Sequence, residues 1–314
     1  ATMQEIPTRT ICIRILPVIC FAAIAGCSWV RAVVDRRTNE AERLTQAARR
    51  AEESGELDEA ASLLTRAVEL SPEEVDIRRR LGEVLLSQGR KREAADHFQF
   101  VLSETPDDAG GHARLARLLF ELDRLDDAEQ RVDAALALEP RLAQALLLKS
   151  ELAERRHDND AALEACYRVL AADRDNVEAQ LRIAAIHLRS SQPDRAAPLL
   201  RSICQNPRAT DEQTSDARWS LGVAYGELER WDEAADTIAE ALERRPNASA
   251  EDWYRLAYAH YLAGELDAAS RALARSLEVQ PDHTDSLTLA SMLNGGAAPN
   301  QIAPVGYVQP VIPI

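Results

Sequence analysis

The amino-acid sequence predicts an all-α solenoid, a row of helical hairpins stacked side by side, and three observations indicate this fold class. Alanine recurs at a constant step along the chain, at Ala60, Ala94, Ala128, Ala162 and Ala196. Proline recurs at the same step, at Pro72, Pro106 and Pro140. Aromatic residues make up only 4% of the chain while hydrophobic residues reach 46%, so alanine and leucine carry the apolar content. That composition suits close helix packing and disfavours a β-sandwich, which is enriched in β-branched and aromatic residues.

Each repeat also carries the periodicity of two short helices. In the second repeat, Leu81 and Leu85 share one face of a helix, because they stand one helical turn apart. Gly89 ends that helix, because glycine favours helix C-termini. Ala94 and Phe98 then share one face of a second helix, which a proline stops. This pattern therefore predicts two antiparallel helices in each repeat.

This pattern resembles the tetratricopeptide repeat family, whose repeats are helix–turn–helix units of about 34 residues. The resemblance implies a right-handed α-solenoid in which hairpins bury their apolar faces by stacking on their neighbours. The fourth repeat departs most, because Lys149 and Ser150 replace its apolar and small pair. Residues 208–214 are interpreted as a loop inserted between the fifth and sixth repeats. The seven predicted repeats occupy residues 41–74, 75–108, 109–142, 143–176, 177–210, 215–248 and 250–283.

Two segments follow the last repeat. Residues 284–294 are predicted to form a helix that caps the array. Residues 295–314 are rich in proline and glycine and contain no charged residue. Such a composition favours an extended, disordered tail.

Residues 1–26 have the features of an export signal. The apolar run at residues 15–24 is too short to cross a bilayer, which takes about 20 apolar residues. Arg9 and Arg14 precede this run, as positive charges precede the apolar region of a signal peptide. The sequence therefore predicts that residues 1–26 are a signal peptide.

The apolar run ends in Ile24-Ala25-Gly26-Cys27, which resembles the lipobox of bacterial lipoproteins. The resemblance implies cleavage before Cys27, lipidation of its thiol, and membrane attachment through residues 27–40 as a linker. It further implies a place in the bacterial cell envelope, on the outer membrane and facing the periplasm. The alternative is an uncleaved anchor helix with the array facing the cytoplasm. Arginines that follow the run favour that alternative under the positive-inside rule.

Two cysteines, Cys166 and Cys204, fall inside the predicted array. Each can serve as a small buried hydrophobic residue. In an oxidising envelope a disulfide between them is the alternative, although their spacing does not require one.

Charge and motif content argue against several functional classes. The net charge of −15 disfavours nucleic-acid binding, which needs clustered lysine and arginine. The histidines and cysteines have no spacing typical of a metal site, and the sequence contains neither a phosphate-binding loop nor a nucleophile elbow. We therefore expect no enzyme activity, no metal and no cofactor.

The resemblance implies that the first helix of each hairpin lines a concave groove that binds a peptide or protein partner. Four aromatic residues of a chain poor in aromatics collect on adjacent first helices, and tyrosine and tryptophan are strong binding anchors. The alternative is that these rings pack between helices. The residues predicted to bind the partner are Trp219, Tyr254, Tyr258, Tyr261, Leu181, Leu188, Phe120, Leu147 and Arg189.

These features together predict a membrane-anchored scaffold that binds a peptide or protein partner in its groove for cell-envelope complex assembly. Two alternatives stay open. The chain could be a structural protein that self-associates into homo-oligomers, or a regulatory scaffold that faces the cytoplasm on an anchor helix.

Overall fold

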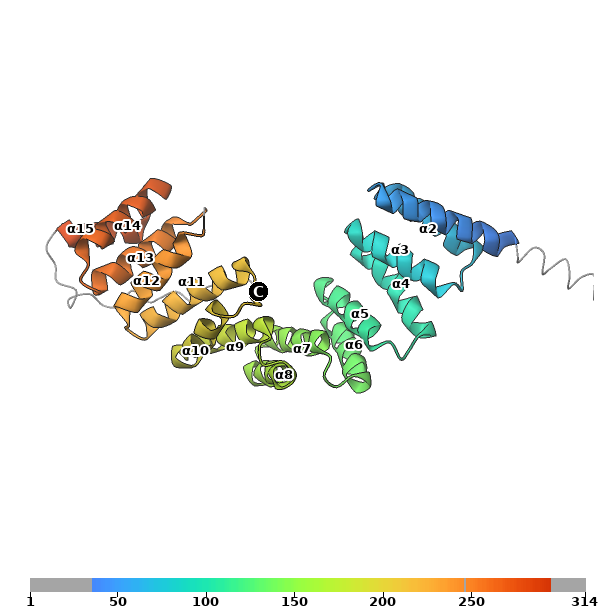
Figure 1. Cartoon of the computed structure of the whole chain (residues 1–314), viewed down its shortest axis with the longest axis horizontal. Helices are drawn as coiled ribbons and strands as arrows, with labels where there is room; N and C mark the ends of the chain where they lie inside the picture. The colour runs from blue at the N-terminus through green and yellow to red at the C-terminus, as the bar shows by residue number, and fades with distance from the viewer. Residues whose placement is uncertain (1–35, 246, 295–314) are drawn as a thin grey trace, which may run out of the picture. The chain divides into compact units, whose positions relative to one another are not determined.

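The computed structural model describes residues 36–245 and 247–294, and in this part of the chain it contains helices and turns but no strand. Figure 1 shows the helices running back and forth along the chain. This arrangement confirms the predicted all-α class of stacked hairpins. The predicted signal peptide, the predicted lipidation site Cys27 and the tail at residues 295–314 lie outside the described residues.

The helices pair in chain order. Helical residues 36–53 precede α2 in the chain, and each odd-numbered helix from α3 to α13 pairs with the even-numbered helix that follows it. The odd-numbered member is called the first helix of its hairpin and the even-numbered member the second helix. The named helices are α2 (Leu57–Leu70), α3 (Val75–Ser87), α4 (Lys91–Glu104), α5 (Ala109–Glu121), α6 (Leu125–Leu138), α7 (Ala143–Arg155), α8 (Asn159–Ala172), α9 (Val177–Arg189), α10 (Pro193–Cys204), α11 (Asp211–Glu227), α12 (Trp231–Leu242), α13 (Ala250–Leu262), α14 (Leu266–Val279) and α15 (Thr284–Asn294).

The chain divides into two compact bodies, with the division after Pro140. The described part of the first body contains helical residues 36–53 and helices α2 to α6. The described part of the second body contains helices α7 to α15. Each body buries its own apolar residues between its hairpins.

Small residues hold the two helices of a hairpin together. The alanines that recur at a constant step lie on the second helices α2, α4, α6, α8 and α10, and all are fully buried. Close approach is tightest at Gly222 of α11, where an added Cβ would lie 2.5 Å from Cγ1 of Ile238 in α12. A side chain at that position would therefore collide with the partner helix.

The same left-handed turn joins the two helices of every described hairpin. One residue in each turn has a positive φ between 54° and 83°. Only glycine adopts this conformation without steric cost. The turn residues are Gly55, Gly89, Asp123, His157, Ser191, Glu229 and Gly264.

Two boundaries differ from the sequence prediction. Residues 36–40, assigned to the linker, are already helical. Residues 211–214, assigned to an inserted loop, are the first residues of α11. The early start of α11 is explained by a capping box. The Thr210 hydroxyl accepts a hydrogen bond from the backbone N–H of Gln213, and the Gln213 side-chain oxygen accepts one from the backbone N–H of Thr210.

The helix α15 packs against α14 and α13 and covers the last hairpin. Leu289 is buried in this contact, and the hydroxyl groups of Ser286 and Ser276 lie 2.7 Å apart. Within residues 36–245 and 247–294, no helix combines the length and the apolar character needed to cross a membrane.

Both array cysteines are free thiols. The Cys166 thiol is fully buried and donates a hydrogen bond to Oγ of Ser150 at 3.1 Å. Burial raises the pKa of both the Cys166 and the Cys204 thiol above the usual range. The hydrogen bond also accounts for Ser150, which is fully buried where other repeats hold a small apolar residue.

Candidate partner-binding face

The first helices of the second body, α7, α9, α11 and α13, form the candidate site, which is called the first-helix face. Contacts join α9 to α11, and ion pairs join α9 to α7. Each of these helices also packs against its own second helix. They are therefore buried on several sides, and α9 and α13 bury even the arginines Arg182 and Arg255.

Arginine recurs at the sixth position of four repeats, at Arg80, Arg114, Arg182 and Arg255, and this set is called the arginine ladder. In the first body, Arg80 donates from Nε and Nη2 to both carboxylate oxygens of Glu52, at 2.7 and 3.0 Å. Arg114 donates to Glu83 at 3.2 Å. Each pair joins one first helix to the first helix of the preceding hairpin.

The most buried arginine of the ladder, Arg182, lies in the second body. Arg182 on α9 donates to Glu151 and, at 3.3 Å, to Glu154, both on α7. Glu178 lies 3.7 Å away on the same helix as Arg182. Only 6% of the Arg182 side chain is exposed. Glu154 also accepts from Arg189, so two helices are joined by a network of charged hydrogen bonds.

The last arginine of the ladder makes a different contact. Nε of Arg255 donates to Glu251 of its own helix at 2.8 Å. Glu227 is the last residue of α11, so it stands one residue nearer to its turn residue Glu229 than Glu52 and Glu154 stand to theirs. Across the described residues, Glu227 makes no hydrogen bond or ion pair. Burial raises the pKa of Glu227, and the charge of Arg255 partly opposes that rise.

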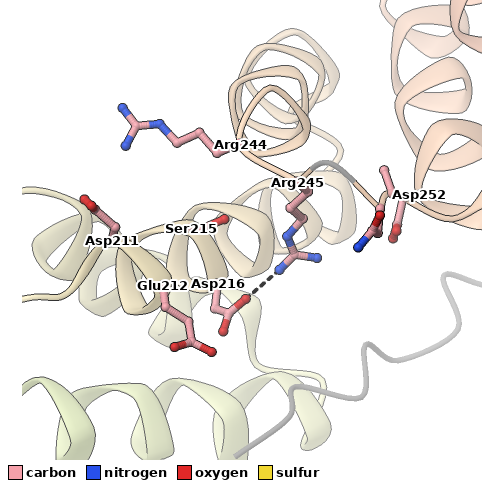
Figure 2. A pocket seen from close by; sticks show the side chains of 9 residues that line it. Asp211, Glu212, Ser215, Asp216, Arg244, Arg245 and Asp252 are labelled. Carbon is pink, nitrogen blue, oxygen red and sulfur yellow. Dashed lines mark hydrogen bonds and ion pairs between the residues drawn. The ribbon is translucent and has the colours of Figure 1, made fainter.

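A cavity of about 690 Å³ opens at one end of the first-helix face, between the start of α11 and the connection from α12 to α13. Nη2 of Arg245 donates to Asp216 at 2.6 Å, as Figure 2 shows, and its guanidinium lies 5.1 Å from the centre of the Trp219 ring. The Arg244 side chain points away from this pair (Figure 2). The cavity lining thus combines a cation fixed by an ion pair with several carboxylates, and the Trp219 ring lies beside that cation.

The predicted aromatic anchors are far less accessible than expected. Trp219 and Tyr254 are 8% exposed, Tyr258 is 6% exposed and Tyr261 is fully buried. The rings of Tyr254 and Tyr258 lie 6.1 Å apart, and Trp231 meets the Tyr258 ring edge-on at 6.1 Å. The alternative interpretation, packing between helices, therefore describes their surroundings better. Neighbouring helices cover the rings, and a role in partner binding stays a prediction.

The other predicted residues lie in different surroundings. Leu147 and Leu188 are buried in the core of the second body, and Leu181 is half-buried beside it. Arg189 is exposed and bound to Glu154. Phe120 belongs to the first body, where it is half-buried with the Arg117 guanidinium 5.8 Å from its ring.

The sequence prediction missed the arginine ladder, Glu227 and the contact of Arg245 with Trp219. A signal for the ladder was present, because Arg80, Arg114 and Arg182 fall on the same constant step as the alanines. Among the described residues, no group of histidine, cysteine, aspartate and glutamate side chains is arranged to hold a metal ion.

Comparison with known proteins connects this fold to a repeat family. A family model described as the tetratricopeptide repeat matches residues 45–109, 155–213, 181–250 and 220–284. A second model of the same description matches residues 92–152. No curated protein sequence matches the chain.

Solved structures share the fold at low sequence identity. A tetratricopeptide repeat protein from Parabacteroides merdae ATCC 43184 is 17% identical with a TM-score of 0.58, covering 82% of this chain and 99% of that one. YrrB, described as a TPR protein with an unusual peptide-binding site, is 22% identical with a TM-score of 0.55, covering 63% of this chain and 99% of its own. MamA from Desulfovibrio magneticus RS-1 is 18% identical with a TM-score of 0.50, covering 55% of this chain and 97% of its own.

Proposed function

The chain belongs to the tetratricopeptide repeat family, and from this premise we propose that it is a scaffold whose first-helix face binds an extended segment of a peptide or protein. The observation that carries the proposal is the set of charged side chains held in place across this face, with the Arg182 network at its centre. The peptide-binding description of YrrB, which shares the fold, supports the proposal.

Fixed side chains favour binding because a partner does not have to order them. Immobilising a long side chain at an interface costs roughly 0.5–1.5 kcal/mol. Arg182, Arg189 and Arg245 are already held by carboxylates in the chain itself. A peptide that contacts this face would therefore meet a surface whose shape and charge are set in advance.

We further propose that the scaffold acts at a bacterial membrane, anchored by a lipid on Cys27, in the assembly of cell-envelope complexes. The support is the lipobox-like sequence ending at Cys27 together with the apolar run before it. Mass spectrometry of the N-terminal peptide from a bacterial expression host tests the anchor. A diacylated Cys27 as first residue supports it, whereas an intact N-terminus without lipid refutes it.

Site-specific crosslinking from cells tests the binding face. A photoactivatable residue at Glu178, whose side chain is 51% exposed on α9, is compared with one at Glu164, exposed on the second helix α8. We expect one defined partner band from position 178 and none from position 164. Equal crosslinking from the two positions would show that the first-helix face is not the binding surface.

Self-association is a second candidate function, favoured by apolar side chains exposed on the last two helices. Leu266 and Val279 of α14 and Leu287 of α15 are each about half exposed. Isolated exposed apolar residues are common on monomers, so what favours this candidate is the presence of three of them on the two terminal helices. Light scattering at increasing protein concentration measures it. A mass that stays at one chain excludes this candidate.

A further inference from the structure

Helical residues 36–53 carry a row of arginines that have no partner. Arg36, Arg43 and Arg50 recur at every seventh residue, which is two helical turns, and therefore share one face. All three are exposed, and their guanidinium groups make no hydrogen bond or ion pair in the part of the chain that the structure describes. The ladder arginines Arg80 and Arg182 are instead bound by carboxylates. The three unpaired residues are called the arginine stripe.

The arginine stripe occupies places that later helices fill with core residues. Arg43 stands one constant step before Ile77, which is buried in α3. Arg50 takes a position that four later first helices fill with an apolar side chain at most 3% exposed. Those side chains are Val84, Leu118, Leu152 and Ile186. Because no described helix precedes residues 36–53, this side of the helix has no earlier hairpin to pack against, and it forms the open end of the array.

The open end of a repeat array must be polar, but it does not have to be positive. A polar outer face keeps terminal repeats soluble, and charges of either sign meet that need. Acidic residues outnumber lysine and arginine in this chain by 52 to 37, so an acidic end would be the expectation. The exposed residues that complete the face of the stripe are Asn39, Gln46 and Glu53, and three arginines less one glutamate leave this face a charge of +2. Glu40 and Glu42 lie on either side of it.

The arginine stripe is also close in sequence to the proposed membrane anchor. Residues 28–35 separate Cys27 from Arg36, and a segment of that length spans about 30 Å even when fully extended. An anchored chain would therefore keep the open end near the membrane surface. Charges act there over roughly a Debye length, about 8 Å at physiological salt, so the acidic residues of distant repeats are largely screened. The stripe then determines the local attraction.

We propose that the arginine stripe docks the open end of the array on a membrane surface by binding anionic phospholipid headgroups. This inference rests on the proposed action at a membrane, and it adds a second attachment that fixes one end of the array against the bilayer. Guanidinium groups suit this contact because their planar fork binds two phosphate oxygens at once. The docking applies equally to a lipidated Cys27 and to an uncleaved anchor helix.

Vesicle co-sedimentation of the full chain tests the docking. Cys27→Ser prevents lipidation and is present in every sample. Affinity for vesicles of phosphatidylcholine alone is compared with affinity for vesicles in which one third of the lipid is phosphatidylglycerol. The ratio of the two affinities is called the anionic preference, and it reports the electrostatic contribution because the apolar run at residues 15–24 enters both affinities alike. The stripe variant combines Arg36→Gln, Arg43→Gln and Arg50→Gln.

A matched control removes three other arginines that are exposed and have no partner in the described chain. This variant combines Arg92→Gln, Arg174→Gln and Arg271→Gln. It changes the net charge as much as the stripe variant does, so that only the place of the charges differs. Circular dichroism of each variant checks that the helices are intact.

We expect a large loss of anionic preference in the stripe variant alone. An arginine near an anionic surface contributes about fivefold in affinity, so removing three should lower the preference about 100-fold. The matched control should keep the preference of the wild type. Replacing the three stripe arginines by lysine should keep most of it, because the charge is retained. A higher salt concentration should lower the preference of the wild type towards that of the stripe variant.

A second measurement locates the contact on the chain. A fluorescent amino acid is placed at Gln46, on the face of the stripe, or at Glu164, which is exposed on α8. Energy transfer to a headgroup-labelled lipid is then recorded with anionic vesicles. Transfer should be stronger from position 46, because docking brings this face against the headgroups.

Several results would overturn the inference. A wild-type chain without anionic preference, an equal loss in the stripe variant and the matched control, or equal energy transfer from positions 46 and 164 would each refute the docking. An unchanged preference, with loss of a concentration-dependent dimer in the stripe variant, would show that the stripe binds a second copy of the chain. Lipid on Cys27 in cells without any anionic preference would refute this inference alone. A preference that depends on the stripe, in a chain found without lipid, would refute the proposed lipid anchor alone.

Discussion

The arginine ladder allows the same substitution to be compared at sites that differ in how deeply the side chain is buried, and Arg182→Met is the most informative case. Methionine keeps the length and flexibility of the side chain and removes the guanidinium. In the second body this leaves Glu151 and Glu154, whose side chains are only 11% and 14% exposed, without Arg182 between them. Arg189 still reaches Glu154 from the exposed side.

The expected cost follows from burial. Removing one partner of a buried ion pair costs about 3–5 kcal/mol, because the remaining charge is left in a poorly solvated place. A loss of about 3 kcal/mol lowers the Tm of a domain of this size by roughly 10 °C. The equivalent pair of Arg114 and Glu83 is more than half exposed on both sides, and exposed pairs contribute about 0–1 kcal/mol.

The assay is urea unfolding followed by circular dichroism for Arg182→Met, Arg80→Met and Arg114→Met. Arg80 is 24% exposed and should fall between the other two. A triple variant, Arg182→Met with Glu151→Leu and Glu154→Gln, removes the stranded charges and should regain most of the stability that Arg182→Met loses. Equal destabilisation by Arg182→Met and Arg114→Met, or no recovery in the triple variant, would refute the reasoning from burial.

Three further substitutions test other features of the fold. Gly222→Ala should destabilise the chain by about 1–3 kcal/mol, because its Cβ would lie 2.5 Å from Ile238, and calorimetry should show a lower Tm than that of wild type. Tyr261→Ala should cost about 3–5 kcal/mol in chemical denaturation, since the ring is fully buried; a change below about 1 kcal/mol would place the ring in solvent. Glu227→Gln should raise stability at neutral pH, because burial raises the pKa of Glu227, and the ionised form is then the one that folding disfavours. The gain should shrink as the pH falls through the folded pKa of Glu227, and a gain unchanged by acid would contradict this explanation.

The repeat pattern was sufficient to predict the fold class. The recurring alanines are buried where the two helices of a hairpin pack closely, and only a small side chain fits there. Their constant spacing in the sequence therefore indicates that the same close packing recurs in each hairpin. The departures in the fourth repeat did not disturb this geometry, because Ser150 is satisfied by the Cys166 thiol. The early start of α11 was also readable from Thr210 and Gln213, whose spacing is that of a capping box.

The candidate site was less predictable. The spacing of Trp219, Tyr254 and Tyr258 places them on first helices but does not say how much of each ring the next hairpin covers. That cover comes from residues of a neighbouring repeat, and it depends on how closely the hairpins stack. The pairing of Arg182 with Glu151 and Glu154 cannot be read from the sequence for the same reason. These residues are 31 and 28 positions apart in sequence and come into contact only when the hairpins stack.

The left-handed turns have a consequence for the order in which the chain folds. A glycine turn closes its hairpin at little conformational cost, whereas a non-glycine residue with positive φ costs about 1–2 kcal/mol and must be held there by packing. Gly55, Gly89 and Gly264 serve the first two hairpins and the last one, while Glu229 and three other non-glycine residues serve those between. Hairpins near the two ends of the array should therefore form first, and pulse-labelled hydrogen exchange during refolding should protect α3 and α13 before α5 and α11. Structure in this array would then spread inward, each central hairpin closing on a neighbour that is already in place.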